Sequence, residues 1–216
     1  MKHTPAEILH EYGPFPDVAG VHGVSFDGER VWFASGEKLN ALDPGTGEIV
    51  GTLDVAASAG TAFDGTHLFQ IAEAVIRKID PHTGEVLGSI PSPGNGADSG
   101  LAWAEGTLWV GQHRNARIHQ VDPETGAVLR TIESDRFVTG VTWVDGELWH
   151  GTWQDEASDV RRIHPDTGEV LERVEMPAGT GVSGLESDGD ERFFCGGGNS
   201  GVVRAIRRPK KAAALA

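Results

Sequence analysis

Short runs of alternating apolar and polar residues recur along the chain, and heptad-like spacing typical of helices is absent. Val75-Ile-Arg-Lys-Ile79 and Glu85-Val-Leu-Gly-Ser-Ile90 are two such runs, and the turn sequence Asp80-Pro-His-Thr-Gly84 lies between them. Alternation over four to eight residues predicts half-buried β-strands. The pattern therefore predicts an all-β protein.

Two kinds of turn sequence repeat in step with these strands. The first occurs as Asp43-Pro-Gly-Thr-Gly47, Asp80-Pro-His-Thr-Gly84, Asp122-Pro-Glu-Thr-Gly126 and His164-Pro-Asp-Thr-Gly168. Proline fixes φ and the closing glycine accepts a positive φ, so each copy predicts a hairpin turn. The second is an Asp-Gly or Glu-Gly pair between apolar residues, as in Trp143-Val-Asp-Gly-Glu-Leu-Trp149. Such a pair is a strong hairpin signal.

A glycine opens each repeat, and the spacing of these glycines predicts the architecture. Gly23, Gly60, Gly100, Gly140 and Gly184 are separated by 37, 40, 40 and 44 residues. Four short antiparallel strands in a repeat of about 40 residues are typical of a β-propeller blade. We therefore predict a five-bladed β-propeller.

The fifth repeat ends without a fourth strand, whereas a β-prone segment at residues 7–12 precedes the first repeat. If this segment forms the outer strand of the last blade, the ring closes without an orphaned edge. Residues 1–216 then form a single domain, and residues 209–216 are a short tail.

Charge and cysteine content exclude several classes of function. Eighteen Lys and Arg residues against thirty-two Asp and Glu residues give a net charge of −14, which disfavours binding to nucleic acid or to an anionic membrane. The single cysteine, Cys195, excludes an internal disulfide and a Cys-rich zinc site. With no apolar signal segment at its start, the chain is expected to be cytoplasmic, and a monomer or weak homodimer.

The loops at one mouth of the central channel are the expected site, because every blade contributes to that face. Two columns of repeat-equivalent residues should line it: His22, Ala59, Ser99, Thr139 and Ser183, which precede the opening glycines, and Gly36, Glu73, His113, Trp153 and Gly198, which follow the second strands. These positions differ between repeats while their surroundings are repeated, so they can carry function.

The two columns suggest three alternatives for His22, His113 and Glu73. They could bind a divalent metal with open coordination positions, or perform acid–base catalysis without a metal, or be polar loop residues with no chemistry. The remaining candidates would bind a small-molecule or peptide substrate, and they are Ser99, Gln112, Arg114, Thr139, Trp153, Gln154 and Ser183. By contrast, His150 and Cys195 lie within strands and are expected to pack between blades.

The run Val144-Asp-Gly-Glu-Leu-Trp-His-Gly-Thr-Trp-Gln154 resembles a segment of the five-bladed glutaminyl cyclases (glutamine cyclotransferases). The resemblance spans nearly the whole chain. It implies that Trp153 binds substrate, and it places His22 where that family has a glutamine. The family's proton-transferring acid falls on Ala59, its lysine on Gly198 and a second tryptophan on Glu73.

A weaker resemblance concerns Asp27-Gly-Glu-Arg-Val-Trp-Phe33, which is similar to repeats of the virginiamycin B lyases (streptogramin lyases). Together the resemblances imply a small-molecule enzyme of transferase or lyase type, acting by histidine acid–base or metal-assisted chemistry. The alternative is a non-catalytic binding module or an inactive cyclase relative.

Overall fold

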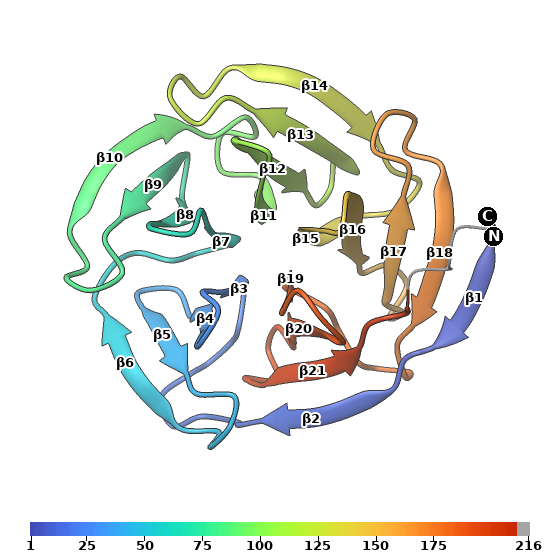
Figure 1. Cartoon of the computed structure of the whole chain (residues 1–216), viewed down its shortest axis with the longest axis horizontal. Coiled ribbons are helices and arrows are strands. Elements are labelled where there is room, and N and C mark those ends of the chain that lie inside the picture. The colour runs from blue at the N-terminus through green and yellow to red at the C-terminus, as the bar shows by residue number, and fades with distance from the viewer. Residues whose placement is uncertain (211–216) are drawn as a thin grey trace.

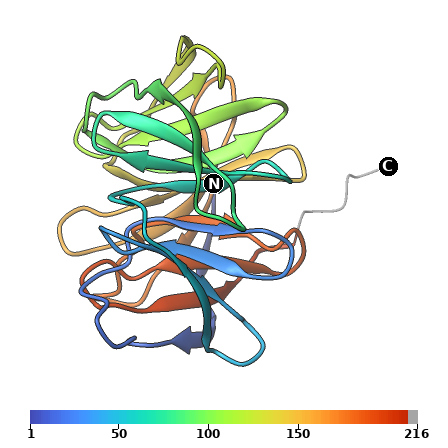
Figure 2. The same cartoon turned by 90° about the vertical axis from the view of Figure 1, so that its left-hand side faces the viewer.

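The computed structural model describes residues 1–210, which form five small β-sheets arranged as blades around a central axis (Figure 1). The predicted all-β, five-bladed propeller is confirmed. The side view shows the blades as twisted sheets stacked around the ring (Figure 2). The described residues contain no helix that is long and apolar enough to cross a membrane.

Each blade runs from an inner strand at the axis to an outer strand at the rim. Blade 1 consists of β3 (Val24–Phe26), β4 (Val31–Ala34), β5 (Leu39–Leu42) and β6 (Ile49–Leu53). Blade 2 consists of β7 (Thr61–Phe63), β8 (Leu68–Ala72), β9 (Val75–Ile79) and β10 (Val86–Pro91). Blade 3 consists of β11 (Asp98–Ala104), β12 (Thr107–Gln112), β13 (Arg117–Val121) and β14 (Val128–Glu133).

The last two blades incorporate the N-terminal strands. Blade 4 consists of β15 (Val138–Val144), β16 (Glu147–Thr152), β17 (Asp159–Ile163) and β18 (Val170–Glu175), with β1 (Lys2–Pro5) outside them. Blade 5 consists of β19 (Leu185–Ser187), β20 (Arg192–Gly196), β21 (Val203–Arg207) and β2 (Ile8–Tyr12).

The predicted closure of the ring by the N-terminal segment is confirmed. Strand β2 pairs antiparallel with β21, and Tyr12 lies opposite Val203. Tyr12 is buried, and its hydroxyl donates a hydrogen bond of 2.9 Å to the carbonyl of Pro44 in blade 1. The closing strand therefore also fastens the last blade to the first. Residues 211–216 of the predicted tail lie outside the described residues.

One strand was not predicted. Strand β1 pairs parallel with β18, which gives blade 4 five strands instead of four. Its residues, Lys-His-Thr-Pro, show no alternation of apolar and polar positions, so the sequence pattern contains no strand signal. Its side chains contribute polar contacts instead, including an ion pair of 2.8 Å between Lys2 Nζ and Glu172.

The repeated Asp-Pro-x-Thr-Gly turns adopt the predicted conformation. In the first copy, Asp43 Oδ1 accepts the backbone N–H of Gly45 at 2.7 Å, and Gly47 has φ 79°. The closing glycines of the other copies have φ between 74° and 76°. In the fourth copy His164 Nδ1 replaces the carboxylate and accepts the N–H of Asp166 at 3.2 Å.

The opening glycines form a closed ring where the inner strands approach one another most closely. A Cβ on Gly100 would lie 2.7 Å from the carbonyl oxygen of Thr139 in the next blade, and one on Gly184 would lie 2.5 Å from Val24 N in blade 1. Only glycine leaves space for this approach. The ring therefore fixes the position, along the propeller axis, of the residue that precedes each glycine. These five residues are the first predicted column.

The core lies between neighbouring blades and is rich in aromatic side chains. Phe69 stacks on Trp103 with ring centroids 5.3 Å apart, and Trp109 stacks on Trp143 at 5.5 Å. His150 and Cys195 are almost fully buried, as expected for residues that pack between blades. Burial lowers the pKa of His150 to about 4 and raises that of Cys195 to about 12, so both are neutral at pH 7.

Candidate functional site

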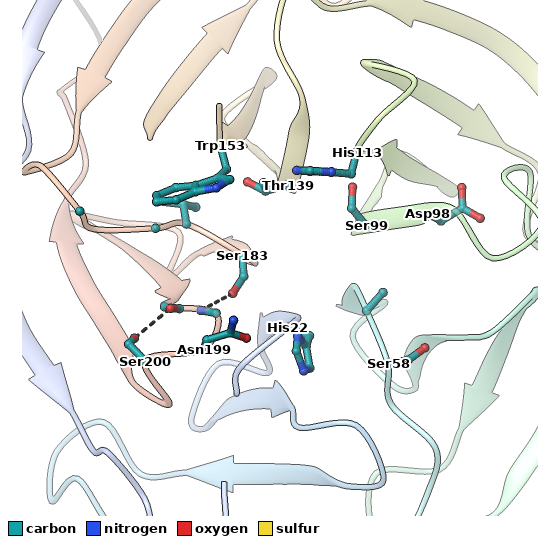
Figure 3. A pocket seen from close by; sticks show the side chains of 16 residues that line it. His22, Ser58, Asp98, Ser99, His113, Thr139, Trp153, Ser183, Asn199 and Ser200 are labelled. Atoms are coloured by element: carbon teal, nitrogen blue, oxygen red, sulfur yellow. Dashed lines mark hydrogen bonds between the residues drawn. The ribbon is translucent and has the colours of Figure 1, made fainter. Parts of the chain in front are cut away.

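A cavity of about 530 Å³ opens on the axis, next to the ring of opening glycines. All five residues of the first predicted column line it, one from each blade: His22, Ala59, Ser99, Thr139 and Ser183. Figure 3 shows His22, Ser99, Thr139 and Ser183 arranged around the opening, with His22 across from His113 and Trp153. The cavity is therefore built by the repeat itself, and its chemistry is set by the residues that differ between blades.

The second predicted column reaches the cavity only in blades 3, 4 and 5. His113, Trp153 and Gly198 line it, whereas Gly36 and Glu73 are not among the lining residues. Glu73 is exposed in a tight turn between β8 and β9, has φ 57°, and its N–H donates to Ser58 Oγ at 3.2 Å. The turn is too short to carry the carboxylate over the cavity.

The predicted trio of His22, His113 and Glu73 is therefore not assembled around the cavity. Within residues 1–210, no three His, Cys, Asp or Glu side chains are grouped so that they could hold a metal ion. The imidazoles of His22 and His113 do line the cavity, and they are its titratable nitrogen groups.

Both imidazoles are half-buried and favour the neutral form. Burial lowers the pKa of His22. Burial also lowers the pKa of His113, and the positive charge of Arg114 lowers it further. Among the described residues no carboxylate forms a hydrogen bond with either ring, and His113 instead contacts the Phe137 ring at a centroid distance of 5.0 Å. A neutral imidazole can accept a proton at pH 7.

The three hydroxyl groups of the first column differ in their bonding. Ser99 Oγ donates to the carbonyl of Val138 at 2.8 Å, and Ser183 Oγ donates to the carbonyl of Val21. Both serines therefore join neighbouring blades. Thr139 Oγ1 is buried at the cavity wall and has no hydrogen-bond partner among the described residues. A buried hydroxyl without a partner is costly, so Thr139 is the hydroxyl of this column that would gain most from a ligand able to reach it.

Asp98 is a lining residue that the predicted site omitted. It begins β11 next to an irregularity in the pairing of β11 with β12. Its carboxylate accepts hydrogen bonds from Gly94 N at 3.0 Å and from Gln112 Nε2 at 3.3 Å. Gln112, a predicted substrate ligand, is buried and supports Asp98 instead of lining the cavity.

Two other predicted ligands also lie outside the lining. Arg114 is exposed on the loop after β12. Gln154 is held in a short bridge with Ala157, and its carbonyl accepts a hydrogen bond of 2.9 Å from Arg136. Their neighbours in sequence, His113 and Trp153, do line the cavity, so these loops contribute one residue each from the predicted set.

Trp153 forms an aromatic wall of the cavity beside a glycine-rich loop. A Cβ on Gly181 would lie 3.5 Å from the indole ring, so the loop backbone passes close to it. The run Gly196-Gly-Gly198-Asn-Ser-Gly201 supplies the adjoining wall through Gly197, Gly198, Asn199 and Ser200. Of these four, only Gly198 was predicted; the other three line the cavity mainly through their place in the loop of blade 5.

Comparison with known proteins supports the fold and places the chain in a family. The family model described as outer membrane protein assembly factor BamB matches residues 72–184. The crystal structure of Myxococcus xanthus glutaminyl cyclase is similar with a TM-score of 0.78 and 17% identity, and the match covers 95% of this chain and 97% of that one. At this identity the likeness concerns the fold.

A second solved structure is more distantly similar. A chain of the mitotic checkpoint complex matches with a TM-score of 0.53 and 19% identity, over 87% of this chain and 63% of that chain. No curated protein matches by sequence. The resemblance to glutaminyl cyclases seen in the sequence is thus confirmed for the five-bladed architecture.

Proposed function

We propose that this chain, which belongs to the family described as outer membrane protein assembly factor BamB, is a propeller scaffold that binds a small molecule. Its cavity would perform histidine acid–base chemistry on that molecule. The observation that supports the proposal is the pairing of two half-buried imidazoles, His22 and His113, with the unpartnered hydroxyl of Thr139 in one cavity.

Each lining residue would have a distinct role in this proposal. His22 or His113, neutral at pH 7, accepts a proton from the substrate as a general base and returns it later in the reaction. Thr139 hydrogen-bonds a polar group of the substrate, and Trp153 packs against its apolar or planar part. If the sequence resemblance to glutaminyl cyclases places that family's acid on Ala59, proton transfer in this cavity would depend on the imidazoles.

The substrate is expected to be uncharged or cationic. Asp98 is the only residue with a charged side chain among those that line the cavity in residues 1–210, since neither lysine nor arginine does so. The net charge of the whole chain is −14. An anionic ligand would therefore meet no compensating cation and would be disfavoured by the surrounding charge.

A screen of small molecules by thermal shift tests the proposal, with hits measured by calorimetry and assayed for turnover. We expect a bound compound to lose affinity about tenfold in Thr139→Val, which removes one hydrogen bond, and to keep it in Thr139→Ser. Turnover should fall in His22→Gln and His113→Gln and remain in His82→Gln, which changes an exposed turn residue. Turnover at the parental rate in the double variant His22→Gln, His113→Gln would overturn the proposed chemistry.

A non-catalytic binding module is the second candidate, and one observation favours it. No carboxylate hydrogen-bonds either cavity imidazole among residues 1–210, so neither ring is oriented by an acid as in acid–base pairs. In that case compounds would bind with the same dependence on Thr139 and Trp153, and none would be converted.

A further inference from the structure

Glu186 places a carboxyl group near the propeller axis, beyond the ring of opening glycines. It lies on the inner strand β19, two residues after Gly184. The equivalent residues of the other four blades are small and uncharged: Ser25, Ala62, Ala102 and Thr142. Glu186 is thus the only acid at this level of the repeat.

Three inner strands converge on this carboxyl group. Thr142 of β15 in blade 4 donates a hydrogen bond to Oε1 through its hydroxyl. The backbone N–H of Ser187 donates to the same oxygen at 2.8 Å. The hydroxyl of Ser25, on β3 in blade 1, also interacts with the carboxyl group. Glu186 therefore connects blades 4, 5 and 1, and blade 5 is the one completed by the N-terminal strand.

Among residues 1–210, no positive charge balances this carboxyl group. Strands β15 and β3 carry no titratable side chain, and β19 carries only Glu186. Strand β20 carries Arg192, which pairs with Asp188 at 2.8 Å, and the thiol of Cys195, which burial keeps neutral. An ionised carboxylate in such surroundings is destabilised by desolvation. Burial raises the pKa of Glu186 to about 7.

We propose that Glu186 is a protonation-dependent lock on the closure of the ring. As a carboxylic acid, Glu186 carries an O–H group that can donate a hydrogen bond to Ser25 Oγ. This oxygen is buried and otherwise lacks a well-formed hydrogen bond. As a carboxylate it leaves an uncompensated charge where blades 4, 5 and 1 meet. The lock does not depend on the function proposed for the cavity.

The same strands connect the lock to the cavity. His22, Thr139 and Ser183 each lie three residues before Ser25, Thr142 and Glu186, respectively. A change in the packing of these strands on ionisation would alter the spacing of the cavity residues. The pH would then influence the cavity mouth in addition to the stability of the ring.

The direction of the effect follows from the pKa shift. The pKa of Glu186 is raised from 4.5 to about 7 in the folded protein, so the folded state retains a proton that the unfolded state has released. The contribution to stability is therefore greatest below the unfolded pKa and decreases as pH rises to about 7. Above that pH the folded protein carries a half-buried charge with no cation beside it among residues 1–210.

Thermal and urea unfolding between pH 5 and pH 8.5 would test the lock, with Glu186→Gln as the neutral isostere and Glu37→Gln as the control at an exposed position. We expect Glu186→Gln to gain stability relative to the parent as pH rises. Because the pKa of Glu186 is about 7 in the folded protein against 4.5, the ratio of the two unfolding constants should change by roughly tenfold to a hundredfold between pH 5 and pH 8.5. Glu37→Gln should follow the parent throughout.

Two outcomes would overturn the proposal. Parallel pH profiles of the parent and Glu186→Gln would show that the carboxyl group ionises alike in the folded and unfolded states. A rise in parental stability at pH 8.5 on adding calcium or sodium chloride, absent in Glu186→Gln, would mean that a cation balances the carboxylate. If Glu186→Gln does not fold, ¹³C NMR titration of the parental glutamate carboxyls gives the same answer, since one signal should titrate near pH 7.

Discussion

The hydroxyl of Thr139 occupies the space that a side chain at Gly151 would fill. A Cβ on Gly151 would lie 2.7 Å from Thr139 Oγ1. Gly111 and Gly196 stand in the same relationship to Ser99 and Ser183. In blades 3, 4 and 5 a glycine in the second strand thus leaves room for a hydroxyl at the cavity, whereas Ala34 and Ile71 take its place in blades 1 and 2.

Gly151→Ala should therefore damage the cavity and the blade together. The new methyl group would contact both Thr139 and Val182, whose Cγ1 would lie 2.6 Å away, and overpacking of this kind costs about 1–3 kcal/mol. Gly88→Ala is a matched control, because nothing lies within 4 Å of the added Cβ. Urea unfolding measures the cost, and unchanged stability of Gly151→Ala would contradict the close packing between Thr139 and Gly151.

The turns that close the hairpins predict a second stability effect. Gly126 has φ 75°, and an added Cβ would lie 2.9 Å from Pro91 at the rim of the preceding blade. Gly126→Val should therefore cost about 2–3 kcal/mol from backbone strain and steric conflict. Circular dichroism melts should show a lower Tm than in Gly88→Val. Equal melting of the two variants would exclude the strained conformation at Gly126.

The cavity histidines predict a pH effect of the opposite sign to that of Glu186. Burial lowers the pKa of His22 and of His113 from 6.5. The unfolded chain consequently binds protons more readily, so the stability that these residues contribute is present above about pH 6.5 and is lost as pH falls through their lowered pKa values.

NMR titration of the imidazole C–H signals checks this prediction directly. The signals that disappear in His22→Gln and in His113→Gln should titrate below pH 6.5. A midpoint above 6.5 for either signal would mean that an acidic group stabilises the charged ring, and the imidazole would then be a weaker candidate for a general base at pH 7.

The repeats made the fold predictable from the sequence. They also made the first column of the site predictable, because the backbone fixes its position. The first column could be placed because it precedes glycines whose close approach leaves no alternative residue. The second column was less accurate because loop length varies between blades, so Glu73 ends in a tight turn whereas His113 and Trp153 reach the cavity. Local polar contacts also escaped prediction, since β1 has no apolar pattern and the free hydroxyl of Thr139 depends on its neighbours in space.

The closure of the ring gives a final prediction, in which the two N-terminal strands have unequal effects. Deleting residues 1–12 removes β2, including the buried Tyr12 and the ion pair of 2.7 Å between Glu11 and Arg204. It also exposes the edge of β21, so we expect a loss of about 3 kcal/mol or more from apolar burial alone.

Deleting residues 1–5 should be much milder, because it removes only β1, whose residues are mostly exposed. Glu172, the buried partner of Lys2, would keep its ion pair of 3.5 Å with Arg162. Comparing the melting of both deletions with that of the full chain separates the two strands. A synthetic peptide of residues 1–12, added to the longer deletion, should restore part of the lost Tm by occupying the vacant edge of β21. If the longer deletion melts like the full chain, β2 does not fasten the ring, and blade 5 must be stable with three strands.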